Sequence, residues 1–388
     1  MNRQQGSLVI EVMVSTLIGT LLLYGAISIL LTSKQTFIAS QGLSRIEERG
    51  RLALEILSED IRMAGYRGCV SSGGQQVINT ISATPDWRME PEVGIRGWEF
   101  SGTNYGDELD VFTLSESAFS SSTWAGGTSS VKGTGIDMLR NSDVLQLWVA
   151  QPYLIDINME SPLTVFDDDG ARLGVASMEG MPADDDENHD RFMVVSDCSR
   201  NLLVKTQEFK NSSNQIYLDK DNFNESAQQL ESLSQPQALL LEGVMYYLAI
   251  PSERDRPSLY RKVVDINDSF DPGESNFANA VEVLPGVLNL QFKYGVNTNN
   301  ELSADTYLDA DDVDDWTQVV SVRVFMLVET ETDRTAPEST STYYFGRTYG
   351  GTSAPDKRIR REFSTTVTLR NRALGLTTVG QVEQAQPP

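Results

Sequence analysis

The chain has few of the residues that most often carry enzyme chemistry. It holds one histidine, His189, and two cysteines, Cys69 and Cys198, in 388 residues. His189 lies in the polar stretch PADDDENHDR, where neither a Ser-His-Asp arrangement nor an HExxH zinc motif can be recognised. The Gly-rich stretches lack the lysine and the spacing of a phosphate loop. We therefore expect no enzymatic activity.

Basic residues are scarce as well. There are 31 Lys and Arg against 55 Asp and Glu, which gives a net charge of -24. The deficit is uneven, because residues 1–68 hold seven basic and six acidic residues, whereas residues 69–388 hold 24 and 49. So acidic a surface repels the phosphates of nucleic acids, and we expect no nucleic-acid partner.

The sequence does contain a long apolar run near its N-terminus. Leu8–Leu31 supplies 24 residues, about 36 Å of helix, which is enough to cross a hydrocarbon core. No small-x-small cleavage site follows the run, unlike in a secretory signal peptide. The pattern continues without proline through Lys34–Ala64. We predict a single helix whose first half spans a membrane.

The second half of this helix is predicted to be amphipathic. Apolar and small residues, with one aspartate, recur at spacings of three and four and form a stripe that needs a partner. The stripe comprises Leu43, Ile46, Gly50, Ala53, Leu54, Leu57, Asp60 and Ile61. A plain membrane anchor followed by a juxtamembrane helix has the same pattern, so the stripe alone does not identify a function.

Glu11 distinguishes the segment from a plain anchor. It is separated from Lys34 by 22 residues without charge, and a carboxylate within a membrane segment costs several kcal/mol unless it is paired or neutralised. If the chain were cut between Gly6 and Ser7, the new amine would lie near the depth of Glu11 in a neighbouring helix. We predict that this ion pair holds adjacent subunits in axial register.

The stretch GSLVIEVMVSTLIG resembles the class III signal of type IV prepilins, a short leader ending in glycine before an apolar helix with glutamate as its fifth residue. The resemblance implies cleavage after Gly6 by a prepilin peptidase and methylation of the new Ser7 amine. Ser7 departs from the phenylalanine usual in major pilins, whereas minor pilins tolerate other residues there. The length of the chain also favours a minor pilin over a major one.

The rest of the chain reads as short strands separated by turns. Glycines at 65 and 68 and a Gly/Ser run end the helical periodicity. Apolar runs predict strands at 107–114, 143–150, 191–198, 201–209, 238–250, 258–264, 287–296, 317–330 and 361–372. The expected fold is α+β, with the long helix packed on an elaborated antiparallel β-sheet head that covers its stripe.

Later stretches extend the resemblance. SDCSR, YYLAI, LYRK, LPGVLNLQFKYGV, TQVVSVRVFMLV and FSTTVTLRNR, in this order, look like the PilW family of type IV pilus minor pilins, which is similar to the J-type minor pseudopilins of type II secretion. The resemblance implies a pilin-like fold and a structural subunit that helps prime pilus assembly at or near the tip. The implied partners are other minor pilins, the major pilin, a PilY-type tip adhesin and the prepilin peptidase.

This interpretation divides the chain into five parts. They are a leader (1–6), a transmembrane and fibre-core helix (7–33), its amphipathic continuation (34–66), a periplasmic β-rich head (67–372) and a tail expected to be disordered (373–388). The chain would reside in the inner membrane and then enter the fibre at the cell surface. The alternatives are a J-type minor pseudopilin and a single-pass periplasmic ligand-binding protein.

The two cysteines lie 129 positions apart and form no CxxC pattern. In a reducing compartment both would be buried thiols, and in an oxidising one they would form a single bridge. Because the N-terminal segment implies export, we predict a disulfide between Cys69 and Cys198.

Two charged stretches remain to be interpreted. LDADDVDDW offers the oxygen ligands that Ca²⁺ prefers, from Asp309, Asp311, Asp314 and Asp315, although it does not match an EF-hand loop. The alternative is a solvated acidic loop, and no other cofactor is expected. The second stretch, DKRIRREF, has four basic residues, which would dock on an acidic loop of this chain or on a neighbouring acidic pilin.

Overall fold

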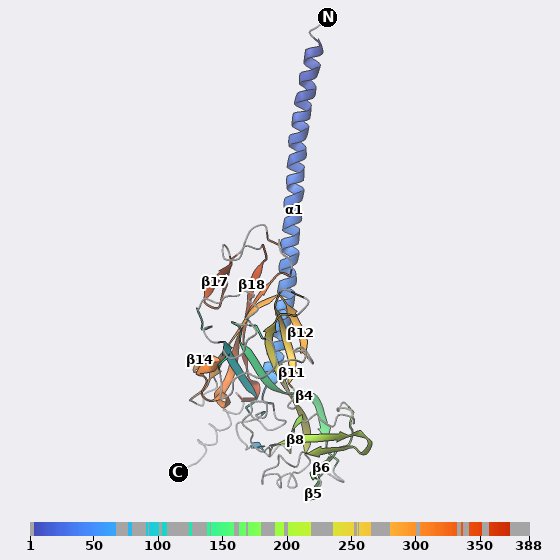
Figure 1. Cartoon of the computed structure of the whole chain (residues 1–388), viewed down its shortest axis with the longest axis vertical. Coiled ribbons are helices and arrows are strands. Elements are labelled where there is room, and N and C mark those ends of the chain that lie inside the picture. The colour runs from blue at the N-terminus through green and yellow to red at the C-terminus, as the bar shows by residue number, and fades with distance from the viewer. Residues whose placement is uncertain are drawn as a thin grey trace, which may run out of the picture.

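The computed structural model describes residues 4–66, 77–79, 91, 93–100, 103–106, 124–125, 138–139, 141–158, 163–167, 170–179, 191–197, 201–218, 236–251, 254, 256–264, 280–299, 303–331, 335–336, 341–350 and 357–372. Figure 1 shows one long helix, α1, whose N-terminal part projects away from a β-rich head and whose C-terminal part lies along that head. The strands gather around the lower part of the helix, so the upper part has no neighbour among the described residues.

Helix α1 runs without interruption from Gln4 to Met63. At about 1.5 Å per residue it is about 90 Å long. The first proline of the chain is Pro85, so no missing amide breaks the helical hydrogen bonds. The helix ends where Gly65 takes a left-handed φ of 68°, a conformation that glycine adopts without steric cost. The Gly65 amide then donates to the carbonyl oxygen of Trp148 at 3.0 Å, which joins the helix end to the sheet.

Twelve of the described strands form one sheet, in the order β3-β2-β4-β10-β7-β8-β9-β6-β5, with β11 added beside β10, β12 beside β11 and β1 beside β8. All of its pairings are antiparallel except that of β1 with β8. The strands are β1 (Val77–Asn79), β2 (Ile95–Phe100), β3 (Trp124–Ala125), β4 (Val144–Asp156), β5 (Leu163–Asp167), β6 (Gly170–Gly174), β7 (Arg191–Ser196), β8 (Asn201–Lys210), β9 (Gln215–Leu218), β10 (Gln237–Ala249), β11 (Ser258–Val264) and β12 (Ala280–Pro285).

Strand β10 divides this sheet into two wings. One of its edges pairs with β4, and its other edge pairs first with β7, through residues 237–241, and then with β11, through residues 243–249. The β7 wing continues to β5, and the β11 wing ends at β12. The β11 wing is the one that lies near the helix, since α1 contacts both β4 and β12.

A second sheet of four described strands has the order β14-β13-β15-β18 and is antiparallel throughout. Its strands are β13 (Val287–Val296), β14 (Thr306–Leu308), β15 (Val319–Glu329) and β18 (Arg360–Thr368), and β16 (Ser341–Tyr344) and β17 (Arg347–Gly350) form a separate hairpin. Among the described residues, three short 3-10 helices connect strands, η3 (Asn211–Ser213), η6 (Ala310–Asp312) and η7 (Trp316–Gln318). Strand β18 makes the most extensive contact of any described strand with α1.

The main core lies between α1 and the two sheets. On the helix, Ile46, Ala53, Leu57 and Ile61 are buried, and they share one cluster with apolar residues of β4, β10, β13, β15 and β18. These four belong to the stripe predicted from the sequence. Leu43, predicted for the same stripe, is exposed at 36%, so that part of the prediction is wrong. The helix turns Gly42 toward the head instead, because the head approaches too closely there to admit a leucine.

The α+β fold with a long helix on a sheet head, as predicted, is confirmed. Eight of the predicted strands correspond to β4, β7, β8, β10, β11, β13, β15 and β18, and the one predicted at 107–114 lies outside the described residues. Strand β18 ends at Thr368 rather than near residue 372, where the chain makes a helical turn. Strands β1, β2, β3, β5, β6, β9, β12 and β14 and the β16–β17 hairpin were not predicted.

Candidate functional site: the stalk helix and its joint with the head

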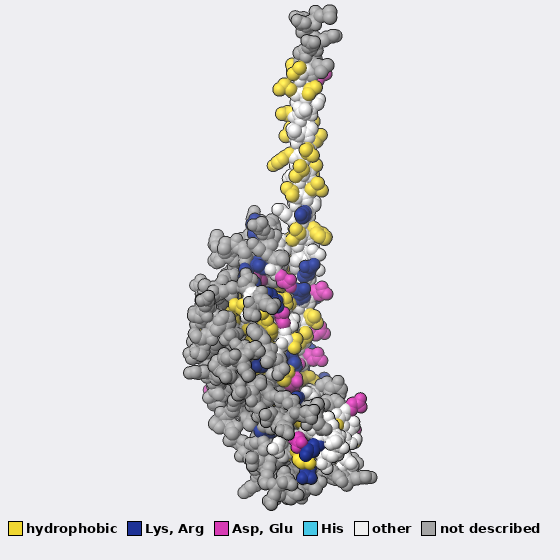
Figure 2. Space-filling view, turned by 45° about the vertical axis from the view of Figure 1, so that its right-hand side comes forward, with side chains coloured by type: hydrophobic (Ala, Val, Ile, Leu, Met, Phe, Trp, Pro, Cys, Tyr) yellow, Lys and Arg dark blue, Asp and Glu magenta, His cyan; other side chains and the backbone are white. Residues whose placement is uncertain are grey.

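The part of α1 from Val9 to Ile38, here called the stalk, presents apolar side chains on every side. Residues such as Leu22, Tyr24 and Leu30 are 70%, 75% and 68% exposed. In Figure 2 hydrophobic side chains cover most of the projecting helix, one acidic side chain lies near its free end, and charged side chains become frequent where the helix meets the head. The helix is long and apolar enough to cross a membrane. A surface this apolar is not stable in water and needs lipid or other protein around it.

The predicted processing and register residues lie at the free end of the stalk. Gly6 and Ser7 fall within the helical backbone, and Glu11 follows one turn after Ser7, on the same side of the helix. The Glu11 side chain is exposed, and its backbone carbonyl accepts a hydrogen bond from the Ser15 hydroxyl at 2.6 Å. Its pairing with a neighbour's Ser7 amine stays a prediction.

Two glycines allow the helix to approach the head closely. A Cβ placed on Gly50 would lie 2.5 Å from Cζ of Phe363 on β18, and one on Gly42 would overlap the methyl group of Thr335. Real Cβ atoms do not approach other heavy atoms so closely. The helix and the head therefore pack closely at both positions, because glycine has no side chain.

A polar clamp fixes the last turns of the helix to the sheet. Asp60 accepts hydrogen bonds from the Tyr246 hydroxyl at 2.7 Å and from Nε of Arg261 at 2.8 Å. Arg261 also pairs with Glu242 at 3.4 Å. Burial, and then the charge of Asp60, raise the pKa of Tyr246 well above its usual range, so that its hydroxyl remains a donor. Asp60 thus joins β10 and β11 to the helix.

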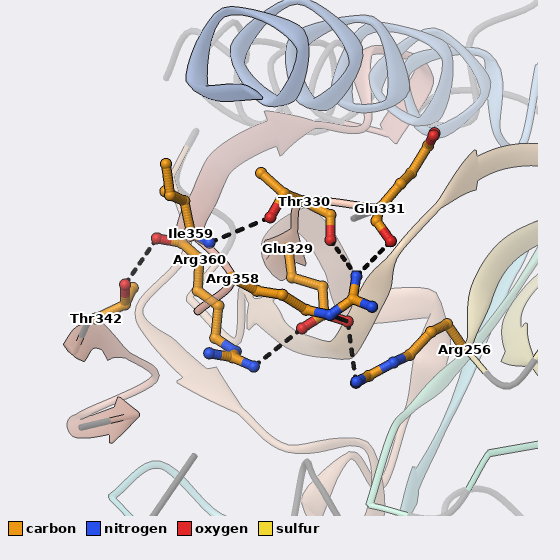
Figure 3. A network of polar contacts seen from close by, with 8 residues as sticks. All are labelled: Arg256, Glu329, Thr330, Glu331, Thr342, Arg358, Ile359 and Arg360. Carbon is orange, nitrogen blue, oxygen red and sulfur yellow. Dashed lines mark hydrogen bonds and ion pairs between the residues drawn. The ribbon is translucent and has the colours of Figure 1, made fainter. Parts of the chain in front are cut away.

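A second polar network surrounds Glu329, at the end of β15 beside the helix (Figure 3). Its fully buried carboxylate lies 3.1 Å from the guanidinium of Arg256, 3.1 Å from that of Arg360 and 3.9 Å from that of Arg358. Arg358 also donates to the carbonyl oxygens of Thr330 and Glu331. The basic stretch DKRIRREF therefore docks within this chain. Its buried arginines meet a strand residue rather than an acidic loop.

The outer arginine of the same stretch contacts the helix. Arg361 pairs with Glu47, which also lies 3.6 Å from Arg51. Between these two helix residues in the sequence, Arg49 pairs with Glu331. All of these residues are partly exposed, so each pair contributes little to stability on its own. With the arginines around Glu329, these residues make the contact between the helix and the head rich in arginine.

Two carboxyl groups are buried where the two sheets meet. Asp143 accepts hydrogen bonds from the amides of Phe100 on β2, at 3.3 Å, and Phe292 on β13, at 2.9 Å. Glu99 is buried beside it and accepts from the Thr103 hydroxyl at 2.8 Å. Loss of solvent raises the pKa of both groups, and the charge of Asp143 raises that of Glu99 further. A proton is therefore retained on Glu99 at neutral pH.

The four aspartates suggested as calcium ligands are not all turned toward one point. Asp309 is buried and lies 2.8 Å from the Lys293 ammonium group, and Asp315 accepts from the amide and the hydroxyl of Thr317. Asp311, in η6, and Asp314 are exposed. Among the described residues no group of three or more possible ligands is placed to hold a metal ion. Calcium binding by these residues stays a prediction.

Several other sequence predictions fall outside the described residues. These are Cys69 and Cys198, with the disulfide between them, His189, and the tail from 373 onward. Conversely, the sequence did not point to Glu99, Asp143 or Glu329. Each is a single acidic residue within or next to an apolar strand, as in GWEF and MLVET, and this is the signal by which such buried carboxyls could have been found.

Comparisons with known proteins give one match. Residues 245–371 match the family model described as Type IV Pilus-assembly protein W. The matched segment, about a third of the chain, begins within β10 and ends just after β18. It therefore includes Arg261 of the polar clamp, Glu329 with its arginines and Phe363 against Gly50. No curated protein and no solved structure matches the chain. The match over residues 245–371 supports a PilW-family type IV pilus protein.

Proposed function

We propose that the chain is a minor pilin, a structural subunit that helps prime assembly of the type IV pilus and sits at or near its tip. The observation that carries the proposal is the helix itself. One unbroken helix has a first half apolar on all sides, with a single carboxylate, and a second half fastened to a β-rich head. Such a subunit can leave a membrane and pack its stalk among other stalks, because both surroundings are apolar.

The family match supports a role in pilus assembly, and the acidic net charge and single histidine favour a structural role over a catalytic one. We further propose that the head faces the periplasm while the stalk is held in the inner membrane, and that both then enter the fibre. Other minor pilins, the major pilin and a tip adhesin are the proposed partners. Within the fibre, Glu11 would pair with the Ser7 amine of the adjacent subunit.

Cleavage of the N-terminus by a prepilin peptidase tests this proposal. Co-expression with a prepilin peptidase should shorten the chain by six residues, because the cut falls after Gly6. Gly6→Val should block the cut, since the peptidase must approach the backbone at a residue without a side chain. Mass spectrometry of the N-terminus in the membrane fraction gives the answer. An intact N-terminus in the presence of active peptidase would rule out the proposal.

A minor pseudopilin of a secretion system would be processed in the same way. Deletion of the gene separates the two functions, because loss of twitching with normal protein secretion supports a pilus subunit. The reverse result supports a J-type pseudopilin. A single-pass ligand-binding protein would show neither defect and no processing.

Calcium binding is a separate proposal for the loop that holds Asp309 to Asp315. Isothermal titration of Ca²⁺ into the full chain in detergent should give heat at millimolar calcium or below, and Asp311→Asn with Asp314→Asn should remove it. Because Asp309 already pairs with Lys293, the exposed aspartates are the ones expected to matter. No heat from the unmodified chain would end the calcium proposal and leave the pilin proposal intact.

A further inference from the structure

A cavity of about 60 Å³ lies between α1 and the ends of β12 and β15. The helix contributes Arg45, Ile46 and Arg49 to its lining, and the strands contribute Leu284, Val328 and Glu331 among others. A single water needs roughly 10–15 Å³ of such space, so the cavity has room for a group the size of a carboxylate. Glu329, Thr330 and Glu331, which belong to the network of Figure 3, also line it.

The charges around this cavity are matched within the chain except for one. Arg49 pairs with Glu331, and Glu329 receives the three arginines described above. Arg45 is exposed and makes no hydrogen bond or ion pair with any residue that the structure describes. In a chain of net charge -24, this site therefore brings an unmatched cation to the edge of a cavity. Such an arrangement attracts an anion.

The walls indicate what kind of anion fits. Ile46, Leu284, Pro285 and Val328 are apolar, so a fully hydrated ion such as phosphate would lose water without replacement on that side. A carboxylate carried on a short alkyl stem matches both the apolar walls and the guanidinium of Arg45. Aspartate and glutamate side chains have this form.

The position along the helix indicates where such a side chain would come from. Arg45 lies 14 residues beyond Leu31, about 21 Å along the axis, which is past the end of the apolar stalk. On the free face of the same helix, Glu48, Glu55 and Glu59 are exposed and form no ion pair among the described residues. A neighbouring subunit with a helix of this kind would carry carboxylates along the surface that passes Arg45.

Resting on the proposed pilin function, we propose that the Arg45 cavity receives an aspartate or glutamate side chain of the neighbouring pilin subunit in the fibre. The contact would lie at the level where the polar parts of adjacent helices first meet. It would be separate from the ion pair proposed for Glu11, which lies at the other end of the stalk.

The first test is charge reversal in cells that assemble pili, using the full chain. Arg45→Glu should lower the amount of the chain in sheared pili by about tenfold, which corresponds to about 1.4 kcal/mol, and Arg45→Lys should retain most of it. Arg51→Glu is the matched control, since Arg51 is on the same helix, is 80% exposed and points to another side. It should stay within about twofold of the unmodified chain, because exposed pairs contribute little.

The second test identifies the partner. A photo-crosslinking amino acid at position 45 should link to a pilin subunit within one helical turn of an aspartate or glutamate, and mass spectrometry locates the linked residue. Reversal of that residue's charge to arginine should then restore Arg45→Glu to near the unmodified level. Crosslinks only to lipid would show that the cavity faces headgroups in the membrane, and crosslinks only within the chain, or none, would also overturn the proposal.

The outcomes separate this inference from the proposed function. If the unmodified chain is absent from sheared pili, the pilin function itself fails. If it is present and Arg45→Glu enters pili as well as Arg51→Glu does, only the inference fails. Circular dichroism and thermal unfolding of each purified variant show whether a loss reflects misfolding, which is not expected at an exposed position, and Arg45→Gln provides a second variant with a smaller change.

Discussion

At the scale of single residues, buried acidic side chains join parts of the head to one another. Asp143 ties a strand of each sheet through backbone amides, and Glu329 gathers three arginines. A buried charge that loses its partner costs several kcal/mol. These carboxyls therefore specify how the parts of the head are placed relative to one another, rather than simply adding stability.

Glu99 allows a prediction about pH. Its pKa in the folded chain is raised above the unfolded value of about 4.3, so the folded state binds an extra proton above that pH. The resulting contribution to stability is complete below about pH 4 and is lost as the pH rises. Glu99→Gln removes this dependence. Between pH 5 and pH 8 the variant should lose about 4 kcal/mol less of its unfolding free energy than the unmodified chain, because one extra bound proton corresponds to about 1.4 kcal/mol per pH unit.

Urea unfolding of the full chain in detergent at the two pH values measures this difference. Glu48→Gln serves as the control, since Glu48 is an exposed carboxylate on the helix, and it should follow the unmodified chain. If Glu99→Gln has the same pH dependence as the unmodified chain, Glu99 is not held protonated in the fold.

At the scale of elements, the close packing of α1 on β18 depends on Gly50, which has no side chain. Gly50→Ala adds one methyl group that would lie within 3 Å of the Phe363 ring. Alanine favours helix by about 1 kcal/mol over glycine, but overpacking a core costs typically 1–3 kcal/mol. We therefore expect a net loss of unfolding free energy. Gly25→Ala, where a Cβ meets nothing within 4 Å, should not destabilise the chain. Thermal unfolding of both variants in detergent gives the comparison, and equal behaviour would contradict the close packing.

The helix shows how far the sequence predicts an element and its contacts. The apolar run and the stripe are local patterns, so the helix, its end near Gly65 and the burial of Ile46, Leu57 and Ile61 followed from them. The patterns did not predict which side of the helix faces the head near residue 42. Leu43 is apolar and Gly42 is not, yet Thr335 and Thr330 approach the helix there, and these residues are nearly 300 positions away in the chain.

The basic stretch DKRIRREF shows that local patterns are equally insufficient to predict the contacts of the site. Lys357, Arg358, Arg360 and Arg361 read as an exposed patch, because charged residues usually are. In the structure Arg358 and Arg360 are buried, and Lys357 and Arg361 are exposed, as the two-residue period of a strand implies. The inward pair is stable only because the carboxylate of Glu329, on β15, lies beside both arginines. No local pattern in the sequence predicts such a contact between distant residues.

At the scale of the whole molecule, the described residues separate into a stalk without contacts to the head and a body that holds the rest. A chain that starts at Lys34 should therefore be soluble in water and keep its unfolding free energy to within about 1 kcal/mol, since such changes at exposed positions are small. It retains every buried helix residue from Ile46 to Ala64. A chain that starts at Ile56 loses Ile46, Gly50 and Ala53 from the core and should not fold.

Size-exclusion chromatography and thermal unfolding of the two truncated chains check this expectation. Aggregation of the chain that starts at Lys34 would mean that the stalk contributes to the fold of the head. Stable folding of the chain that starts at Ile56 would mean that the docked part of the helix is dispensable.

The unbroken helix also determines how the molecule responds to a pull. A force that draws the head away from the stalk runs along the helix axis, because no proline or hinge interrupts residues 4–63. The helix lies lengthwise against the head (Figure 1), so the contacts at Gly42, Phe363 and Asp60 are strained together, in sliding, and not opened one after another. Contacts arranged in this way share the tension, which would suit the proposed position at or near the tip of a pilus.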